Sequence, residues 1–252
     1  MSYKILQIIC STNRIEYLSR TLESQKKLDF SGCEVTKYFV DDYPLGRTDS
    51  FLINFVKEYG FDIQNLHKEN IGITRTWQEI FDFIKERDFD YVWHQEDDAE
   101  ILYPVKIVDL IKMLEDDPSL SQIQLKRQNW YPHETDPVGI KDDDQIVGNY
   151  RMERGNQYFW MMSSLYPAWI AKEPILEETG NYPSEGVIAH WMLVKFNKNV
   201  GIIKTLDGNI MVNHIGEYFR GIRVLKNEPG WERFQYFDPN VNYDSKTGEI
   251  WK

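Results

Sequence analysis

The chain has 252 residues, 42% of them hydrophobic and 14% aromatic, which is enough to build a sizeable core in one large domain or two small ones. Lys and Arg number 29 against 40 Asp and Glu, and the net charge of -11 disfavours a general nucleic-acid or anionic-membrane surface, because the long-range field repels polyanions. Two cysteines are too few for a disulfide framework. The apolar run over residues 5–10 is too short for the core of a signal peptide, and no later run could span a bilayer, so we expect a soluble, cytoplasmic protein.

Predicted strands and helices alternate through the first hundred residues. Strands are predicted over residues 3–10, 35–40 and 62–67 and from Tyr91 onward. Helices are predicted between them: one capped by Asn13 in a capping box with Glu16, one over about 49–59 that ends at Gly60, and one after Gly72. Their apolar positions recur at helical spacing: Leu18 and Leu22; Phe51, Phe55, Val56 and Tyr59; Ile73, Trp77, Ile80, Phe81 and Ile84. This alternation predicts right-handed βαβ units and a largely parallel sheet.

Polar residues follow each of the four strands. In a parallel sheet, ligands bind beyond the carboxyl ends of the strands, so these residues are expected along one edge. They are Thr12, Asn13 and Arg14; Asp41 and Asp42; Asn70 and Gly72; and Glu96, Asp97 and Asp98. An acid at this edge can bind a nucleobase or a ribose hydroxyl, whereas Arg14, Arg75 and helix N-termini can bind a diphosphate. Each signal alone also has a structural explanation, such as a helix cap, a turn or relief of backbone strain.

The fourth strand carries the strongest chemical signal. Residues 91–93 predict a buried strand that runs into three adjacent acids, Glu96, Asp97 and Asp98. Carboxylates this close repel one another, so they must protonate, be solvated or share a cation. In an extended chain Glu96 and Asp98 face one side and Asp97 the other, which gives two oxygen ligands for a divalent ion and leaves positions for water and a substrate phosphate. A solvated acidic loop is the alternative interpretation.

These motifs, in this order and spacing, resemble the glycosyltransferases of the GT-A fold, especially the family 2-like members. Residues 11–14 and the spacing from Leu18 to Leu22 are similar to the Thr-x-Asn-Arg-type segment and helix after the family's first strand. The pair 41–42 resembles the Asp-Asp that holds the nucleotide, and residues 70–72 resemble the family's Asn-x-Gly. The acids 96–98 resemble its Asp-x-Asp metal motif, with Glu in place of the first Asp. The resemblance covers about residues 4–100.

The resemblance implies an α/β, Rossmann-like GT-A fold, in which a mixed, mainly parallel central sheet is flanked by helices in a single domain. Residues 1–100 would form the half that binds the nucleotide sugar, 101–225 the acceptor half, and 226–252 a C-terminal tail packed on the body. The implied nucleotide-binding residues are Thr12, Asn13, Arg14, Asp41, Asp42, Asn70, Gly72, Arg75 and Asp97.

The resemblance also implies roles for three kinds of side chain. Glu96, Asp98 and His214 would hold Mn²⁺, or Mg²⁺, because the family often places a His ligand after its last core strand. Glu185 would be the catalytic base of an inverting enzyme, since it is the acid in the loop before a predicted helix that ends near Phe196. A Glu favoured by the dipole of that helix, and a His that is only hydrogen-bonded, are the structural alternatives.

The second half of the chain is less regular in pattern. We expect a helix over 105–114, strands over 122–125, 158–165, 200–204 and 209–212, and a long loop over 128–155 in which residues 142–144 form a solvated acidic turn rather than a metal site. His94 and His190 are interpreted as structural.

The predicted function is transfer of a sugar from a nucleotide-sugar donor, expected to be UDP-linked, to a hydroxyl of a glycan, lipid or protein. Two other classes stay open: a nucleotidyltransferase, although segment 11–14 is not Gly-rich, and a non-catalytic module that binds a nucleotide sugar or carbohydrate. Within the transferase class, glycosylation of a DNA base is a minority option because of the negative net charge.

Overall fold

The computed structural model describes residues 2–12, 14–42, 49–67, 71–127, 141–155, 162–175, 185–215, 242–243 and 250–251. The chain divides into a large compact unit, Met1–Asn213, and a small one, His214–Lys252. In the small unit, β14 (Asn242–Tyr243) and β15 (Ile250–Trp251) form an antiparallel pair. No helix in the described part of the chain combines the length and the apolar character that a bilayer crossing requires.

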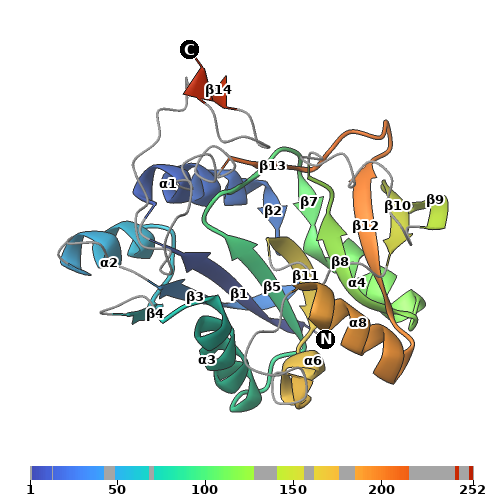
Figure 1. Ribbon diagram of the computed structural model, residues 1–252, viewed down its shortest axis with the longest axis horizontal. Coiled ribbons are helices and arrows are strands. Elements are labelled where there is room, and N and C mark those ends of the chain that lie inside the picture. Colours follow the sequence, from blue (N-terminus) through green and yellow to red (C-terminus); the bar gives the residue numbers. More distant parts are fainter. Residues whose placement is uncertain are drawn as a thin grey trace. The chain divides into compact units, whose positions relative to one another are not determined.

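The large unit contains the helices and the main sheet (Figure 1). Its helices are α1 (Ile15–Ser24), α2 (Asp49–Lys57), α3 (Ile73–Lys85), α4 (Ile107–Asp116), α6 (Trp169–Lys172) and α8 (Glu185–Phe196), with the short 3-10 helix η1 (Gln25–Lys27) after α1. Its main strands are β1 (Tyr3–Ser11), β3 (Cys33–Asp41), β4 (Ile63–Leu66), β5 (Tyr91–Glu96), β8 (Leu120–Leu125), β9 (Lys141–Val147), β10 (Tyr150–Gly155), β11 (Ser163–Pro167) and β12 (Asn199–Thr205). Shorter strands are β2 (Leu28–Asp29), β6 (Ala99–Ile101), β7 (Val105–Lys106) and β13 (Val212–His214), the last of which ends at the first residue of the small unit.

Nine described strands form one mixed sheet in the order β4-β3-β1-β5-β11-β8-β12-β10-β9. The four strands from the first hundred residues are parallel to one another, as the alternation of strands and helices predicts. Strand β11 runs antiparallel to both of its neighbours, β5 and β8, whereas β12 is parallel to β8. The predicted α/β fold with a mixed, mainly parallel sheet is therefore confirmed.

Hydrophobic side chains alternate between the two faces of the sheet, as the period of a strand requires. On β1, Leu6, Ile8 and Cys10 lie in one core with residues of α3, α6 and α8. The intervening Ile5 and Ile9 lie in two other cores, one with residues of α4 and one with residues of α1 and α2. Figure 1 shows α3 and α6 side by side, which agrees with their direct contact.

Local predictions hold best where the apolar period is strong. Leu18 and Leu22 of α1, and Trp77, Ile80, Phe81 and Ile84 of α3, are all buried. One local prediction depends on a residue outside the described part of the chain, and one is wrong. The N-cap residue of α1 is Arg14, without a side-chain hydrogen bond to the helix, and the predicted capping box depends on Asn13, which lies outside the described residues. Phe51 of α2 is 55% exposed and stacks on Phe55 instead of entering the core.

The predicted long loop over 128–155 is also wrong in its second part. Residues 141–155 form the antiparallel hairpin β9–β10 at the edge of the sheet, so Asp142–Asp144 belong to a strand and not to a turn. Gly148, with φ 59°, opens the two-residue turn between the strands, which is the position where a hairpin needs glycine. Residues 128–140, and residues 158–161 of the predicted strand over 158–165, lie outside the described residues.

Candidate metal centre

The carboxyl ends of β1, β3 and β5 meet at one edge of the sheet. Ser11, the last residue of β1, is in register with Asp41 of β3, and Cys10 is in register with Glu96 of β5. Two backbone hydrogen bonds of 2.9 Å extend this edge, one from the Asp42 amide to the Ser11 carbonyl and one from the Asp97 amide to the Cys10 carbonyl. The register thus gathers the polar residues that follow these strands, where a parallel sheet binds its ligands.

Only the first of the three acids belongs to the extended strand. β5 ends at Glu96, and Asp97 and Asp98 form a turn that leads into β6. Asp97 is fully buried, and its carboxylate accepts hydrogen bonds from the Ser11 hydroxyl at 3.0 Å and from the Thr12 amide at 3.2 Å. Burial raises the pKa of Asp97, while the charge of Arg14 opposes the rise. Asp97 is therefore a fixed anchor of the turn, held by the end of β1.

Arg14 is the cation that compensates this acidic turn. Its guanidinium forms ion pairs with Asp97 and, at 2.6 Å, with Asp98 Oδ2. The arginine side chain is 18% exposed and the two carboxylates are 1% and 4% exposed, so both pairs are largely shielded from water. Burial alone would lower the pKa of Arg14, but Asp97 and Asp98 raise it above its usual value. Arg14 consequently stays charged and holds one oxygen of Asp98 in place.

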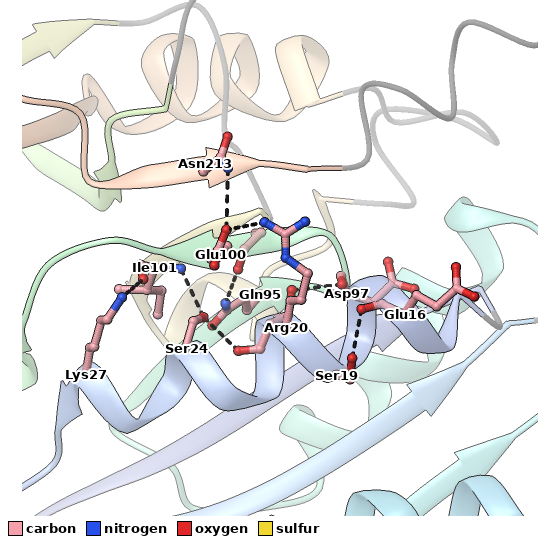
Figure 2. A network of polar contacts seen from close by, with 12 residues as sticks. Glu16, Ser19, Arg20, Ser24, Lys27, Gln95, Asp97, Glu100, Ile101 and Asn213 are labelled. Atoms are coloured by element: carbon pink, nitrogen blue, oxygen red, sulfur yellow. Dashed lines mark hydrogen bonds and ion pairs between the residues drawn. The ribbon is translucent and has the colours of Figure 1, made fainter. Parts of the chain in front are cut away.

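Helix α1 lies alongside the turn and β6, and its side chains reach toward them (Figure 2). The Thr21 hydroxyl donates to the Asp97 carbonyl at 2.8 Å, and the Ser24 hydroxyl accepts from the Ile101 amide at 3.0 Å. Arg20 forms an ion pair with Glu100 at 2.7 Å, and the Asn213 side chain donates to the same carboxylate at 3.4 Å. These contacts fix both ends of β6 against the helix. Sequence patterns did not single out Thr21 or Ser24, because their partners lie about eighty residues away.

Glu96, Asp98 and His214 are the one group of three His, Cys, Asp or Glu residues, among those described, that could hold a metal ion. Each offers one ligand atom, and these atoms lie within 4.8 Å of one another. His214 ends β13 directly after Asn213, the residue bonded to Glu100. Asp98 and His214 are buried and Glu96 is half-buried. Two carboxylates and an imidazole form a donor set that suits Mn²⁺, and also Mg²⁺ through the oxygens. The residues predicted as metal ligands are thus brought together.

Asp42, predicted to bind the nucleotide, is engaged within the chain. Its carboxylate accepts from the amides of Ile71 at 3.0 Å and Gly72 at 3.2 Å, and it lies 3.2 Å from His67 Nδ1. The other nitrogen of His67 lies 2.7 Å from Glu79 Oε2. Gly72 has a φ of 83°, which favours glycine at this point. Asp42 therefore positions the segment that leads into α3, a role that the sequence pattern did not reveal.

The remaining predicted nucleotide-binding residues are placed as follows. Asp41 is buried at the end of β3, and Arg75 is exposed in the first turn of α3. Thr12 follows β1, and its amide donates a hydrogen bond to the Asp97 carboxylate. Asn70 lies outside the described residues, as does Asn13.

Cys10 and His94 form a buried polar pair under this edge, with Sγ and Nε2 3.2 Å apart. Burial raises the pKa of the Cys10 thiol well above its usual value and lowers the pKa of His94 to about 3. Both side chains are therefore neutral near pH 7, which makes a thiolate nucleophile or a charged histidine unavailable here.

Solved structures resemble the chain at low sequence identity. S. aureus TarS 1-349 superposes with a TM-score of 0.54 at 12% identity over 84% of this chain. The mannosyltransferase PcManGT from Pyrobaculum calidifontis, in complex with GDP-Man and Mn²⁺, superposes with a TM-score of 0.51 at 13% identity over 80% of this chain. GalNAc-T7 with UDP, GalNAc and Mn²⁺ superposes with a TM-score of 0.56 at 10% identity over 85% of this chain. The chain has the GT-A fold.

The chain spans 60%, 57% and 44% of the lengths of these three structures, in the same order. No protein-family model and no curated protein sequence matches it. At these identities the likeness extends to the GT-A fold alone, which is the fold that the motifs of the first hundred residues predict.

The predicted catalytic base of this GT-A chain, Glu185, is the first residue of α8. The backbone of that helix is described from Glu185 onward, but the Glu185 side chain lies outside the described part of the chain. Its assignment as a base thus stays a prediction that depends on its place in the sequence.

Proposed function

We propose that the chain is a metal-dependent glycosyltransferase that moves a sugar from a nucleotide-sugar donor, UDP-linked, to an acceptor hydroxyl, with inversion at the anomeric carbon. The observation that carries the proposal is the group of Glu96, Asp98 and His214 at the end of β5 in a GT-A fold. The likeness to structures that contain GDP-Man and Mn²⁺, or UDP, GalNAc and Mn²⁺, supports the same chemistry for this chain.

The proposed ligands are Glu96, Asp98 and His214, with Mn²⁺ preferred over Mg²⁺ because one donor is an imidazole. When bound, the ion stabilises the charge that develops on the diphosphate as the sugar leaves. Arg14 pairs with Oδ2 of Asp98 at 2.6 Å, and this contact orients the Asp98 carboxylate. The half-buried Glu96 completes the set from the end of β5, two residues before Asp98.

The donor nucleotide is proposed to lie along the same edge of the sheet. Thr12, Asn13, Asp41, Asn70, Gly72 and Arg75 are the proposed contacts, and Asp42 and Asp97 support them by fixing the adjoining backbone. The two amides held by Asp42 set the path of the chain into α3, so the position of Gly72 and of the first turn of that helix depends on this carboxylate. An exposed cation in that turn, Arg75, is suited to a phosphate.

Glu185 is proposed to take the proton from the acceptor hydroxyl as it attacks the sugar. The acceptor is proposed to be a glycan, lipid or protein hydroxyl. A carboxylate at the start of a helix is stabilised as an anion by the helix dipole, which keeps it able to accept a proton.

The test is binding of Mn²⁺ and UDP by titration calorimetry, followed by turnover with a panel of nucleotide sugars. Asp98→Asn, which keeps the size of the side chain, should abolish Mn²⁺ uptake and sugar release, whereas Asp88→Asn, at an exposed acid paired with Lys4, should change neither. Absence of Mn²⁺ and Mg²⁺ binding by the wild-type protein, with or without UDP, would overturn the proposal. A preference for nucleoside triphosphates would indicate a nucleotidyltransferase instead, and donor binding without turnover a non-catalytic module.

A further inference from the structure

The large unit contains a concave site whose lining residues have no role in the proposed chemical step. It is a pocket of about 310 Å³. Four separate parts of the chain line it: the end of β2, the segment from Tyr103 into the first turn of α4, the turn between β9 and β10, and the end of β12 with Met211. None of the proposed metal-binding or nucleotide-binding residues lines it. Its volume is at the lower end of the range for ligand pockets and fits a single small ring.

The inner surface of the pocket is apolar and aromatic. Val105 and Met211 are buried beneath it, whereas Tyr103 is 39% exposed at its edge. Tyr150 is 6% exposed, and its hydroxyl accepts a hydrogen bond from the Lys106 amide at 3.3 Å, which fixes the ring. An aromatic ring with one accessible face packs well against the C–H face of a pyranose, because that face of the sugar is apolar.

The rim of the pocket carries hydrogen-bonding groups of both kinds. Asp29 and Asp109 offer carboxylate acceptors, Lys106 offers an ammonium donor, and Asn149 offers an amide that can both donate and accept. Asp29 and Lys106 are in register across the β2–β7 pair, so an acceptor and a donor stand side by side. Neighbouring hydroxyls of a sugar each need one donor and one acceptor, and this rim supplies them.

The charge of the rim decides between classes of ligand. Two carboxylates against one ammonium leave a net charge of -1 in the pocket, within a chain whose total is -11. Such a rim repels phosphates and other anions. A purely apolar ligand would leave the polar groups of the rim desolvated and without hydrogen-bond partners. A neutral polyhydroxylated ring satisfies both the aromatic wall and the rim.

We propose that this pocket binds one sugar unit of a neutral glycan, with Tyr103 as the stacking platform and Asp29, Lys106, Asp109 and Asn149 as the hydroxyl partners. Binding here is independent of the proposed transfer reaction. If that reaction is correct, the pocket holds a more distant unit of a glycan acceptor, because Tyr103 is five residues beyond Asp98 and a chain of that length spans at most about 17 Å.

The experiment measures glycan binding by saturation-transfer NMR on the full chain. Chitotriose, maltotriose and cellotriose are the neutral probes, and glucose 6-phosphate is the anionic probe. At least one neutral trisaccharide should bind, with saturation transfer to its ring protons, and glucose 6-phosphate should not. Tyr103→Ala should weaken that binding about tenfold or more, since it removes the stacking face. Asn149→Ala, on an exposed turn, should weaken it as well.

Two controls separate this proposal from the proposed function. Phe51→Ala removes another exposed aromatic ring, on α2, and should leave glycan binding unchanged. Asp98→Asn should also leave it unchanged even where it abolishes Mn²⁺ binding. Thermal unfolding checks that each variant is folded. The proposal is overturned if none of the three neutral glycans binds at about 20 mM, or if Tyr103→Ala and Asn149→Ala bind them as the wild-type protein does.

Discussion

Replacement of Arg14 by Met tests the two largely buried ion pairs of the candidate site. Met keeps much of the apolar stem that packs in the structure but removes the guanidinium. Arg14 pairs with two carboxylates that are 1% and 4% exposed, so its loss leaves two negative charges close together and away from water. Removing one partner of a buried ion pair costs about 3–5 kcal/mol, and the second carboxylate places this site at the upper end. That is a large part of the stability of an ordinary domain.

The assay is equilibrium unfolding in urea, followed by tryptophan fluorescence, in buffer that contains EDTA. Arg14→Met should lower the urea midpoint strongly with little change in the slope. Arg20→Met is a matched control on α1, the helix that Arg14 precedes, because Arg20 is 51% exposed and its pair with Glu100 is at the surface. That control should lose less than about 1 kcal/mol.

Two further measurements show whether charge is the cause. Arg14→Met combined with Asp97→Asn should lose less than the sum of the two single changes, since the double variant buries one charge fewer. Added Mn²⁺ should stabilise Arg14→Met more than the wild-type protein, because the ion replaces the missing positive charge. A loss below about 1 kcal/mol for Arg14→Met, equal to that of Arg20→Met, would refute the reasoning.

Two other predictions concern the core. Burial lowers the pKa of His94 from 6.5 to about 3, so below pH 6.5 only the unfolded state takes up this proton, and stability is lost as pH falls towards 3 by up to about 1.4 kcal/mol per pH unit. His94→Gln should flatten this part of the curve of unfolding free energy against pH. His190→Gln, a change at an exposed histidine, should leave the curve as it is in the wild-type protein. Parallel curves for His94→Gln and the wild-type protein would contradict the assignment. A Cβ on Gly201 of β12 would lie 2.8 Å from Ile123 Cδ1 and 2.9 Å from Met152 Sδ, so Gly201→Ala should cost about 1–3 kcal/mol in urea unfolding. Ile123→Val removes that Cδ1 and should recover part of the loss in the double variant; strictly additive losses would show that the clash is absent.

Local patterns were sufficient for the first half of the fold. The apolar period of α3 and the alternation of strands and helices up to Glu96 are properties of short segments. They are enough to predict that β1, β3, β4 and β5 run parallel in one sheet. The hairpin at 141–155 was missed because its strands carry Asp142–Asp144 and pair at the edge of a sheet, where one face need not be apolar.

The sequence by itself determined which residues stand at the ends of the parallel strands, since the apolar run of each strand stops there. It also singled out Glu96, Asp98 and His214, although the last through a family resemblance. Only the tertiary structure decided that Arg14 pairs with Asp97 and Asp98, that Asp42 holds Ile71 and Gly72, and that the segment around Tyr103 meets the turn at Asn149. Partners of this kind lie about 30 to 85 residues apart in the sequence. Sheet register and packing decide which of many possible residues come into contact, and no short window of sequence contains that information.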